Sequence, residues 1–229
     1  MTYSDYRRVA RENLHGNWGL SVLAGAVAAL LGGMILGSSF IPEFNFRVDN
    51  QDISSLKDLL NLYTASAGIF AFKLGSALAL AQFIVGGVIE LGYAHYLLKQ
   101  HNRANFDLQD LFSQFNHFSK GFLQHFLRGL YCFLWGLLLI IPGIVKAYAY
   151  AMTPFILAEN PNLTANEAIT ASKELMDGHK GELFILGLTF IGWDLLAALT
   201  MNLGHLVLNP YKNAAYAAFY KHLTAPKMN

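Results

Sequence analysis

The sequence contains little charge and almost no cysteine. Only 14% of its 229 residues are charged, whereas soluble domains carry about 25%. The formal net charge of +1 gives no sign of the strongly basic surface that binds nucleic acid, so we expect no nucleic-acid partner. A single cysteine, Cys132, excludes an internal disulfide and any paired-cysteine metal or redox motif.

Recognisable catalytic and nucleotide-binding motifs are also missing. The sequence has no HExxH, no GxSxG, no Walker loop and no GxGxxG. None of its eight histidines pairs with another at HxxxH spacing beside a carboxylate. We therefore expect a protein that is not an enzyme and that holds no metal and no cofactor.

What the sequence does contain is long apolar runs. Hydrophobic residues make up 54% of the chain, and residues 13–42 include no Lys, Arg, Asp or Glu. Because about 20 apolar residues cross the hydrocarbon core of a bilayer, residues 18–41 are predicted to be a first membrane span. Further apolar runs follow, so this span is read as retained rather than as a cleaved signal peptide. Residues 66–98 are the second predicted span.

Two later runs are long enough to be read in two ways. A helix over residues 127–158 would be about 48 Å long, which exceeds a hydrocarbon core of about 30 Å. It is either one tilted span or a hairpin that turns at the structural break Pro142-Gly143, where proline disrupts the helix and glycine permits a turn. Residues 183–208 and the tail behind them pose the same choice, with a possible turn at 202–204.

The fold class follows from these readings. We predict an all-α, polytopic transmembrane helical bundle that forms one domain over residues 1–229. Six spans are favoured and four are possible. Both counts place the two termini on one side, and basic residues near both ends favour the cytoplasm. The counts differ on residues 159–182, which would lie outside with four spans and inside with six.

Three amphipathic segments accompany the spans. In the basic N-terminal segment, residues 1–15, one face of a helix carries tyrosine, alanine and leucine and the opposite face carries arginines. Such a helix either lies at the membrane interface or serves as a topology signal. Residues 108–118 predict a second surface helix. The connector 163–178 predicts a third, started by a capping box at Thr164 and Glu167 and ended by Gly178.

Asp194 is the sharpest candidate for a functional site. It lies within an apolar run, and an ionisable group inside a span usually faces the bundle interior or a water-filled cavity. One reading is a polar intramembrane site for a proton or cation, with Lys146 or His205 as its partner. The other is an Asp near a span end that is hydrogen-bonded to a neighbouring helix. Glu90, near the end of the second predicted span, is expected to extend toward the membrane surface.

Several long strings give the chain a family resemblance. The quoted segments are IPGIVKAYAYAMTPFILAENPNLTANEAITASKELMDGHKGELF, FIGWDLLAAL, NPYKNAAYAAFY and RENLHGNWGLSV. They resemble an uncharacterised bacterial integral membrane protein family, domain of unknown function 975. The resemblance implies a multi-pass helical protein of the bacterial cytoplasmic (cell) membrane, and it implies no catalytic residues and no ligand.

Two functional hypotheses remain. The first is a non-enzymatic envelope scaffold or partner-binding protein, which has the lipid bilayer and other membrane proteins as partners. The second is a small-solute or ion transporter or channel that uses the polar site around Asp194. A water-accessible cavity at Asp194 would favour the second hypothesis, and a sealed bundle would favour the first.

Overall fold

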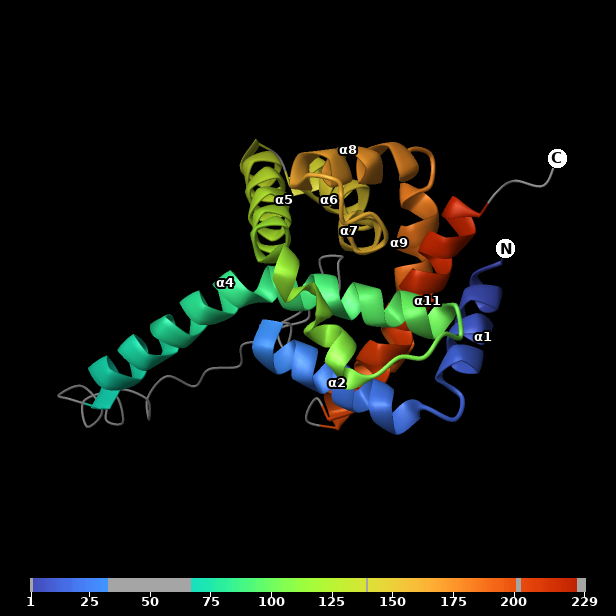
Figure 1. The fold of residues 1–229 in the computed structure, drawn as a ribbon, viewed down its shortest axis with the longest axis horizontal. Helices are drawn as coiled ribbons and strands as arrows, with labels where there is room; N and C mark the ends of the chain where they lie inside the picture. Colours follow the sequence, from blue (N-terminus) through green and yellow to red (C-terminus); the bar gives the residue numbers. More distant parts are fainter. Residues whose placement is uncertain (1, 33–66, 139, 201–202, 226–229) are drawn as a thin grey trace.

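The computed structural model describes residues 2–32, 67–138, 140–200 and 203–225. Every regular element in these ranges is a helix (Figure 1), which confirms the all-α class. The elements are α1 (Tyr3–Leu14), α2 (Trp18–Gly32), α4 (Ala67–His101), η2 (Leu108–Leu111), η3 (Ser113–His117), α5 (Phe118–Leu138), α6 (Ile140–Ala149), α7 (Thr153–Glu159), α8 (Ala165–Leu175), α9 (Lys180–Leu188), α10 (Ile191–Leu199) and α11 (His205–Thr224). The end of the first predicted span and the residues between it and the second predicted span lie outside the described residues.

The C-terminal half of α4 is the centre of the core. It packs against α2, α5, α7 and α11, and its side chains from Val88 to Leu98 include many that are almost fully buried. Two glycines of α4 allow close approach. A methyl group on Gly87 would lie 2.2 Å from the carbonyl oxygen of Gly121 in α5, and one on Gly92 would lie 1.9 Å from the carbonyl oxygen of Leu111 in η2.

Helix α1 has the predicted amphipathic pattern and is docked on the protein. Tyr6, Ala10 and Leu14 are buried, and α1 packs along α11 (Figure 1). The ring of Tyr6 meets the ring of Phe219 edge to face at 5.3 Å between centroids. The predicted apolar face is therefore used for contact between the first and last helices.

Helices α5 and α6 form a hairpin, one of the two arrangements considered for this region. They pack closely against each other, and a methyl group on Gly143 would lie 2.8 Å from the Cα of Gly136. Helix α5 ends at Leu138 and α6 begins at Ile140, so the boundary between the two helices lies ahead of the predicted break at Pro142-Gly143. Pro142 lies in the first turn of α6, where its missing N–H removes no intrahelical hydrogen bond.

A second hairpin joins α10 to α11. Gly204 approaches Ala197 so closely that an added methyl group would be 2.7 Å from the Ala197 Cα. The backbone N–H of Gly204 donates to the Thr200 hydroxyl at 2.8 Å. Gly136 and Gly143 are seven positions apart in the sequence, and so are Ala197 and Gly204. Small residues thus allow the close approach of the two helices in both hairpins.

The predicted number of spans is not supported. By length and composition, the described residues contain two helices that could cross a membrane, Ile141–Glu159 and Lys180–Leu199. The count rises to three at most if α1 and α2, which are bent by 102° relative to each other, form one broken span. Helix α5 interrupts its apolar pattern with Lys120, Gln124, His125 and Arg128, and such groups weigh heavily against membrane insertion.

The connector helix α8 follows its predicted start and stop signals. Thr164 and Glu167 form the capping box, and the hydrogen bonds that Thr164 donates hold the pKa of the Glu167 carboxyl below its usual value. Gly178 has a left-handed φ of +78° just beyond the end of the helix. The buried face of α8 packs on α5 and α7, and the Ser172 hydroxyl donates to the Ala149 carbonyl at 2.9 Å.

The surface helix predicted over residues 108–118 is wrong. The segment forms two short 3-10 turns that lead directly into α5. Asp107 caps the first turn by accepting the Leu108 N–H at 2.7 Å, and the Asp110 carboxylate binds the Lys99 ammonium at 2.6 Å. Ser113 then donates its hydroxyl to the Asp110 carbonyl. The bonds made by Asp107 and Ser113 are local and compete with the regular helical ladder, and the Asp110–Lys99 pair anchors the segment to α4.

Candidate functional site

Asp194 lies in a cluster with two residues from the next helix. Asp194 is in the first turn of α10, and His205 and Lys212 lie seven residues apart in α11, which places them on one face of that helix. The Lys212 ammonium is 3.2 Å and 3.3 Å from the two carboxylate oxygens of Asp194. The His205 Nε2 is 3.6 Å from one of those oxygens. We call these three residues the Asp194 cluster.

The burial of the three side chains is uneven. The Lys212 side chain is only 3% exposed, whereas those of Asp194 and His205 are 27% and 24% exposed. A lysine at this depth is stable as a cation only when an anion compensates it. The carboxylate therefore neutralises Lys212 and ties α10 to α11.

The sequence-predicted site residues are only partly brought together. Asp194 and His205 are neighbours, as one reading proposed. Lys146 is elsewhere, because its ammonium lies 4.7 Å from the centroid of the Trp135 ring, a cation–π contact within the α5–α6 hairpin. Gly143 packs against Gly136 in that same hairpin, and Pro142 lies in the first turn of α6.

Sequence reasoning missed Lys212. It lies in the tail behind residues 183–208, for which the sequence predicts no site residue. A signal was present, because a lone lysine within an apolar helical pattern is costly unless an acid faces it. Its spacing of seven from His205 would have placed both side chains on the face that meets Asp194.

Glu90 is a buried carboxylate, which contradicts its predicted location at the membrane surface. Glu90 is 1% exposed and lies between α4 and α5. Its carboxylate accepts hydrogen bonds from His125 at 3.0 Å, from Gln124 at 3.3 Å and from Arg128. The close approach of Gly87 and Gly121 one turn away brings the two helices together. Glu90 is thus an interhelical anchor, and it does not extend to the membrane surface.

A third carboxylate is paired in the same way. Glu159, at the end of α7, accepts the Tyr220 hydroxyl at 2.7 Å and pairs with the Lys221 ammonium. Both partners are on α11. All three carboxylates therefore join one helix to another.

Residues 136–227 match a family model described as a protein of unknown function, DUF975. This segment is therefore similar to the DUF975 family. The match confirms the resemblance over the part of the chain that runs from the α5–α6 turn to the end of α11. It contains the whole Asp194 cluster and both candidate spans. No curated protein and no solved structure matches the chain.

Proposed function

We propose that the chain is a multi-pass protein of the bacterial cytoplasmic membrane that acts as a non-enzymatic scaffold or binds partner membrane proteins. The observation that carries this proposal is the neutralisation of Asp194, the strongest candidate for a transport site, by Lys212 on both carboxylate oxygens. A carboxylate that is paired in this way links one helix to another. Glu90 and Glu159 have the same arrangement.

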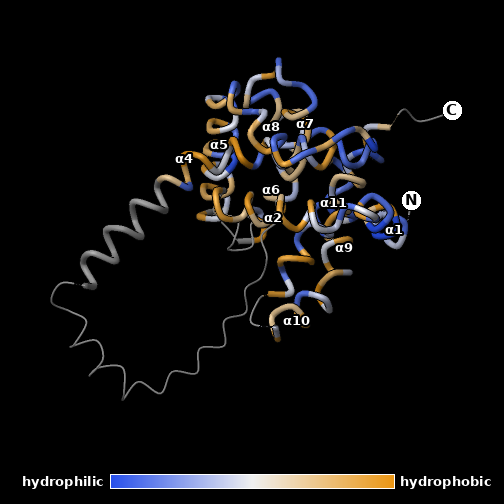
Figure 2. The backbone as a smooth tube through the Cα atoms, turned by 60° about the horizontal axis from the view of Figure 1, so that its bottom comes forward, coloured by the Kyte–Doolittle hydropathy of each residue, from blue (hydrophilic) through white to orange (hydrophobic). Residues whose placement is uncertain are grey.

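An exposed apolar surface supports placement in the membrane. In the candidate span Lys180–Leu199 only 22% of the most apolar 18-residue stretch is buried. Figure 2 shows hydrophobic colouring on α10, whereas α1 is largely hydrophilic. The large hydrophobic side chains exposed on α9 and α10 are Phe184, Ile185, Leu188, Ile191, Trp193, Leu195, Leu196 and Leu199. Soluble monomers rarely expose so continuous an apolar surface, so lipid is its natural environment.

The pairing of the first and last helices bears on topology. Helix α1 packs along α11, so both ends of the described chain lie on one side of the molecule. An even number of crossings fits this arrangement. The arginines of α1 favour the cytoplasm for that side.

A transporter is the second candidate function, and one observation favours it. The His205 Nδ1 is buried and has no hydrogen-bond partner in the part of the chain that the structure describes. Together with the partial exposure of Asp194, this histidine could pass a proton to or from the carboxylate. The two functions differ in whether ions cross the bilayer.

Flux through sealed liposomes distinguishes these functions. We expect liposomes containing the protein and a trapped pH-sensitive dye to respond to an imposed proton or potassium gradient no faster than protein-free liposomes. A protonophore added at the end confirms that the vesicles were sealed. A flux that Asp194→Asn abolishes, and that Asp177→Asn on the exposed turn after α8 leaves intact, would contradict the scaffold function and establish the transporter.

A further inference from the structure

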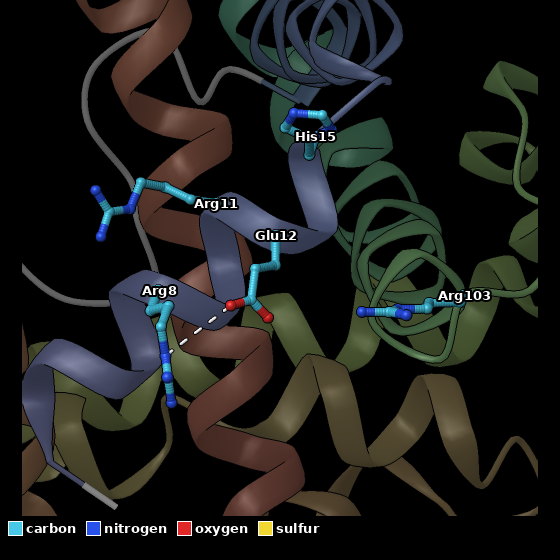
Figure 3. A pocket seen from close by; sticks show the side chains of 5 residues that line it. All are labelled: Arg8, Arg11, Glu12, His15 and Arg103. Carbon is cyan, nitrogen blue, oxygen red and sulfur yellow. Dashed lines mark ion pairs between the residues drawn. The ribbon is translucent and has the colours of Figure 1, made fainter.

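A pocket of about 460 Å³ lies between α1 and the turn that follows α4 (Figure 3). Its lining consists of Arg8, Arg11 and Glu12 of α1, His15 just beyond that helix, and Arg103 of the turn. The guanidinium of Arg103 extends toward α1 in Figure 3. Two segments that are far apart in the sequence thus bring arginines to one concave site.

The charges in this pocket are not balanced. Arg8 is shared between Asp5 at 3.2 Å and Glu12 at 3.9 Å. Arg11 and Arg103 have no acidic partner among the residues that the structure describes. The three arginines outnumber the single glutamate in the lining, so the pocket attracts anions.

The backbone at Arg103 points to a role for its side chain. Helix α4 ends in a Schellman motif, in which the Ala104 N–H donates to the Lys99 carbonyl at 3.0 Å and the Arg103 N–H donates to the Gln100 carbonyl at 3.1 Å. The residue at this position must adopt a left-handed conformation, and Arg103 has a φ of +53°. Glycine is the usual residue there. The chain holds an arginine where glycine would be more stable, and the scaffold function does not explain why.

We infer that this pocket binds an anion that carries a phosphate group. Guanidinium groups form paired, charge-assisted hydrogen bonds with phosphate oxygens, and arginines on both sides of the pocket could bind one phosphate from two directions. The same chemistry is present in a lipid phosphate headgroup and in a soluble phosphate monoester. The inference is independent of the proposed scaffold function, since neither the Asp194 cluster nor the exposed apolar surface contributes to the pocket.

Calorimetric titration of the purified full-length chain in a neutral detergent tests the inference. The probes are glycerol phosphate, short-chain phosphatidic acid and, as a lipid without an exposed phosphate monoester, short-chain phosphatidylcholine. We expect Arg103→Gln to weaken binding about tenfold, which is what the loss of one charged hydrogen bond produces. Glu12→Gln should strengthen binding, and Lys173→Gln on the exposed face of α8 should leave it unchanged.

Arg103→Gly separates the binding role of the side chain from a structural one. Glycine relieves the left-handed strain, so this variant should melt at a higher temperature than the original protein and bind as weakly as Arg103→Gln. Binding of glycerol phosphate would identify a soluble anion, and binding of phosphatidic acid alone would identify a lipid headgroup. If no probe binds saturably, or if Arg103→Gln and Lys173→Gln weaken binding equally, the inference is wrong.

Discussion

Replacement of Lys212 by methionine is expected to destabilise the folded protein by about 3 kcal/mol, the lower end of the range for breaking a buried ion pair. Methionine fills a similar volume but leaves the Asp194 carboxylate without its cation. The lower end applies because the Asp194 side chain is 27% exposed, so water partly solvates the carboxylate that has lost its cation. Equilibrium unfolding in mixed detergent micelles measures this loss.

A double-mutant cycle shows whether the loss comes from the pair itself. Asp194→Leu combined with Lys212→Met replaces both charges by apolar groups, and such replacements of buried ion pairs are often neutral or stabilising. We expect the double variant to recover most of the stability that Lys212→Met loses. Lys173→Met, an exposed lysine on α8, should change stability by less than about 0.5 kcal/mol. Losses in the double variant equal to the sum of the single losses would show that the two side chains do not interact.

Gly92→Ala is expected to produce the second large effect. The added methyl group would lie 1.9 Å from the carbonyl oxygen and 2.6 Å from the carbonyl carbon of Leu111. These are backbone atoms of η2, which cannot rotate away as a flexible side chain could. The helix and the turn must separate, and we expect a loss of about 3 kcal/mol or more, at the upper end of overpacking effects.

Gly129→Ala is the matched control for this substitution. Gly129 lies within α5, and a methyl group there would meet no atom within 4 Å. Alanine in a helix interior is favoured over glycine by about 0.5–1 kcal/mol, so this variant should be slightly more stable than the original protein. Comparable losses for the two variants in the same unfolding assay would contradict the close packing of α4 on η2.

The helical class and two of the three amphipathic segments could be predicted because their signals are local. The face of α1 that contains Tyr6 and Leu14, and the capping box of Thr164 and Glu167, depend on residues three or four positions apart. The 3-10 turns over residues 108–117 were missed because they depend on a distant contact. The Asp110 carboxylate binds the Lys99 ammonium, 11 positions earlier in the chain. The spacing of apolar residues does not predict that bond.

The candidate site shows the same limit. Asp194 could be singled out because a charge in an apolar run is visible in the sequence, but its partner depends on how two helices pack. Gly204 against Ala197 sets the approach of α10 and α11, and this approach brings Lys212 rather than Lys146 to the carboxylate. Charge alone could not decide between the two lysines. Glu90 was misplaced for the same reason, since its partners lie 34–38 residues further along the chain.

The central claim is that the exposed apolar surface of α10 faces lipid. We would test it with an environment-sensitive fluorophore on single cysteines in a Cys132→Ser background, after reconstitution into bilayers. One cysteine replaces Leu195, which is 65% exposed on α10, and the other replaces Glu174, which is exposed on α8. We predict that quenchers on lipid acyl chains will extinguish the emission at position 195 and that aqueous iodide will extinguish it only at position 174. Equal quenching by iodide at both positions would contradict the claim.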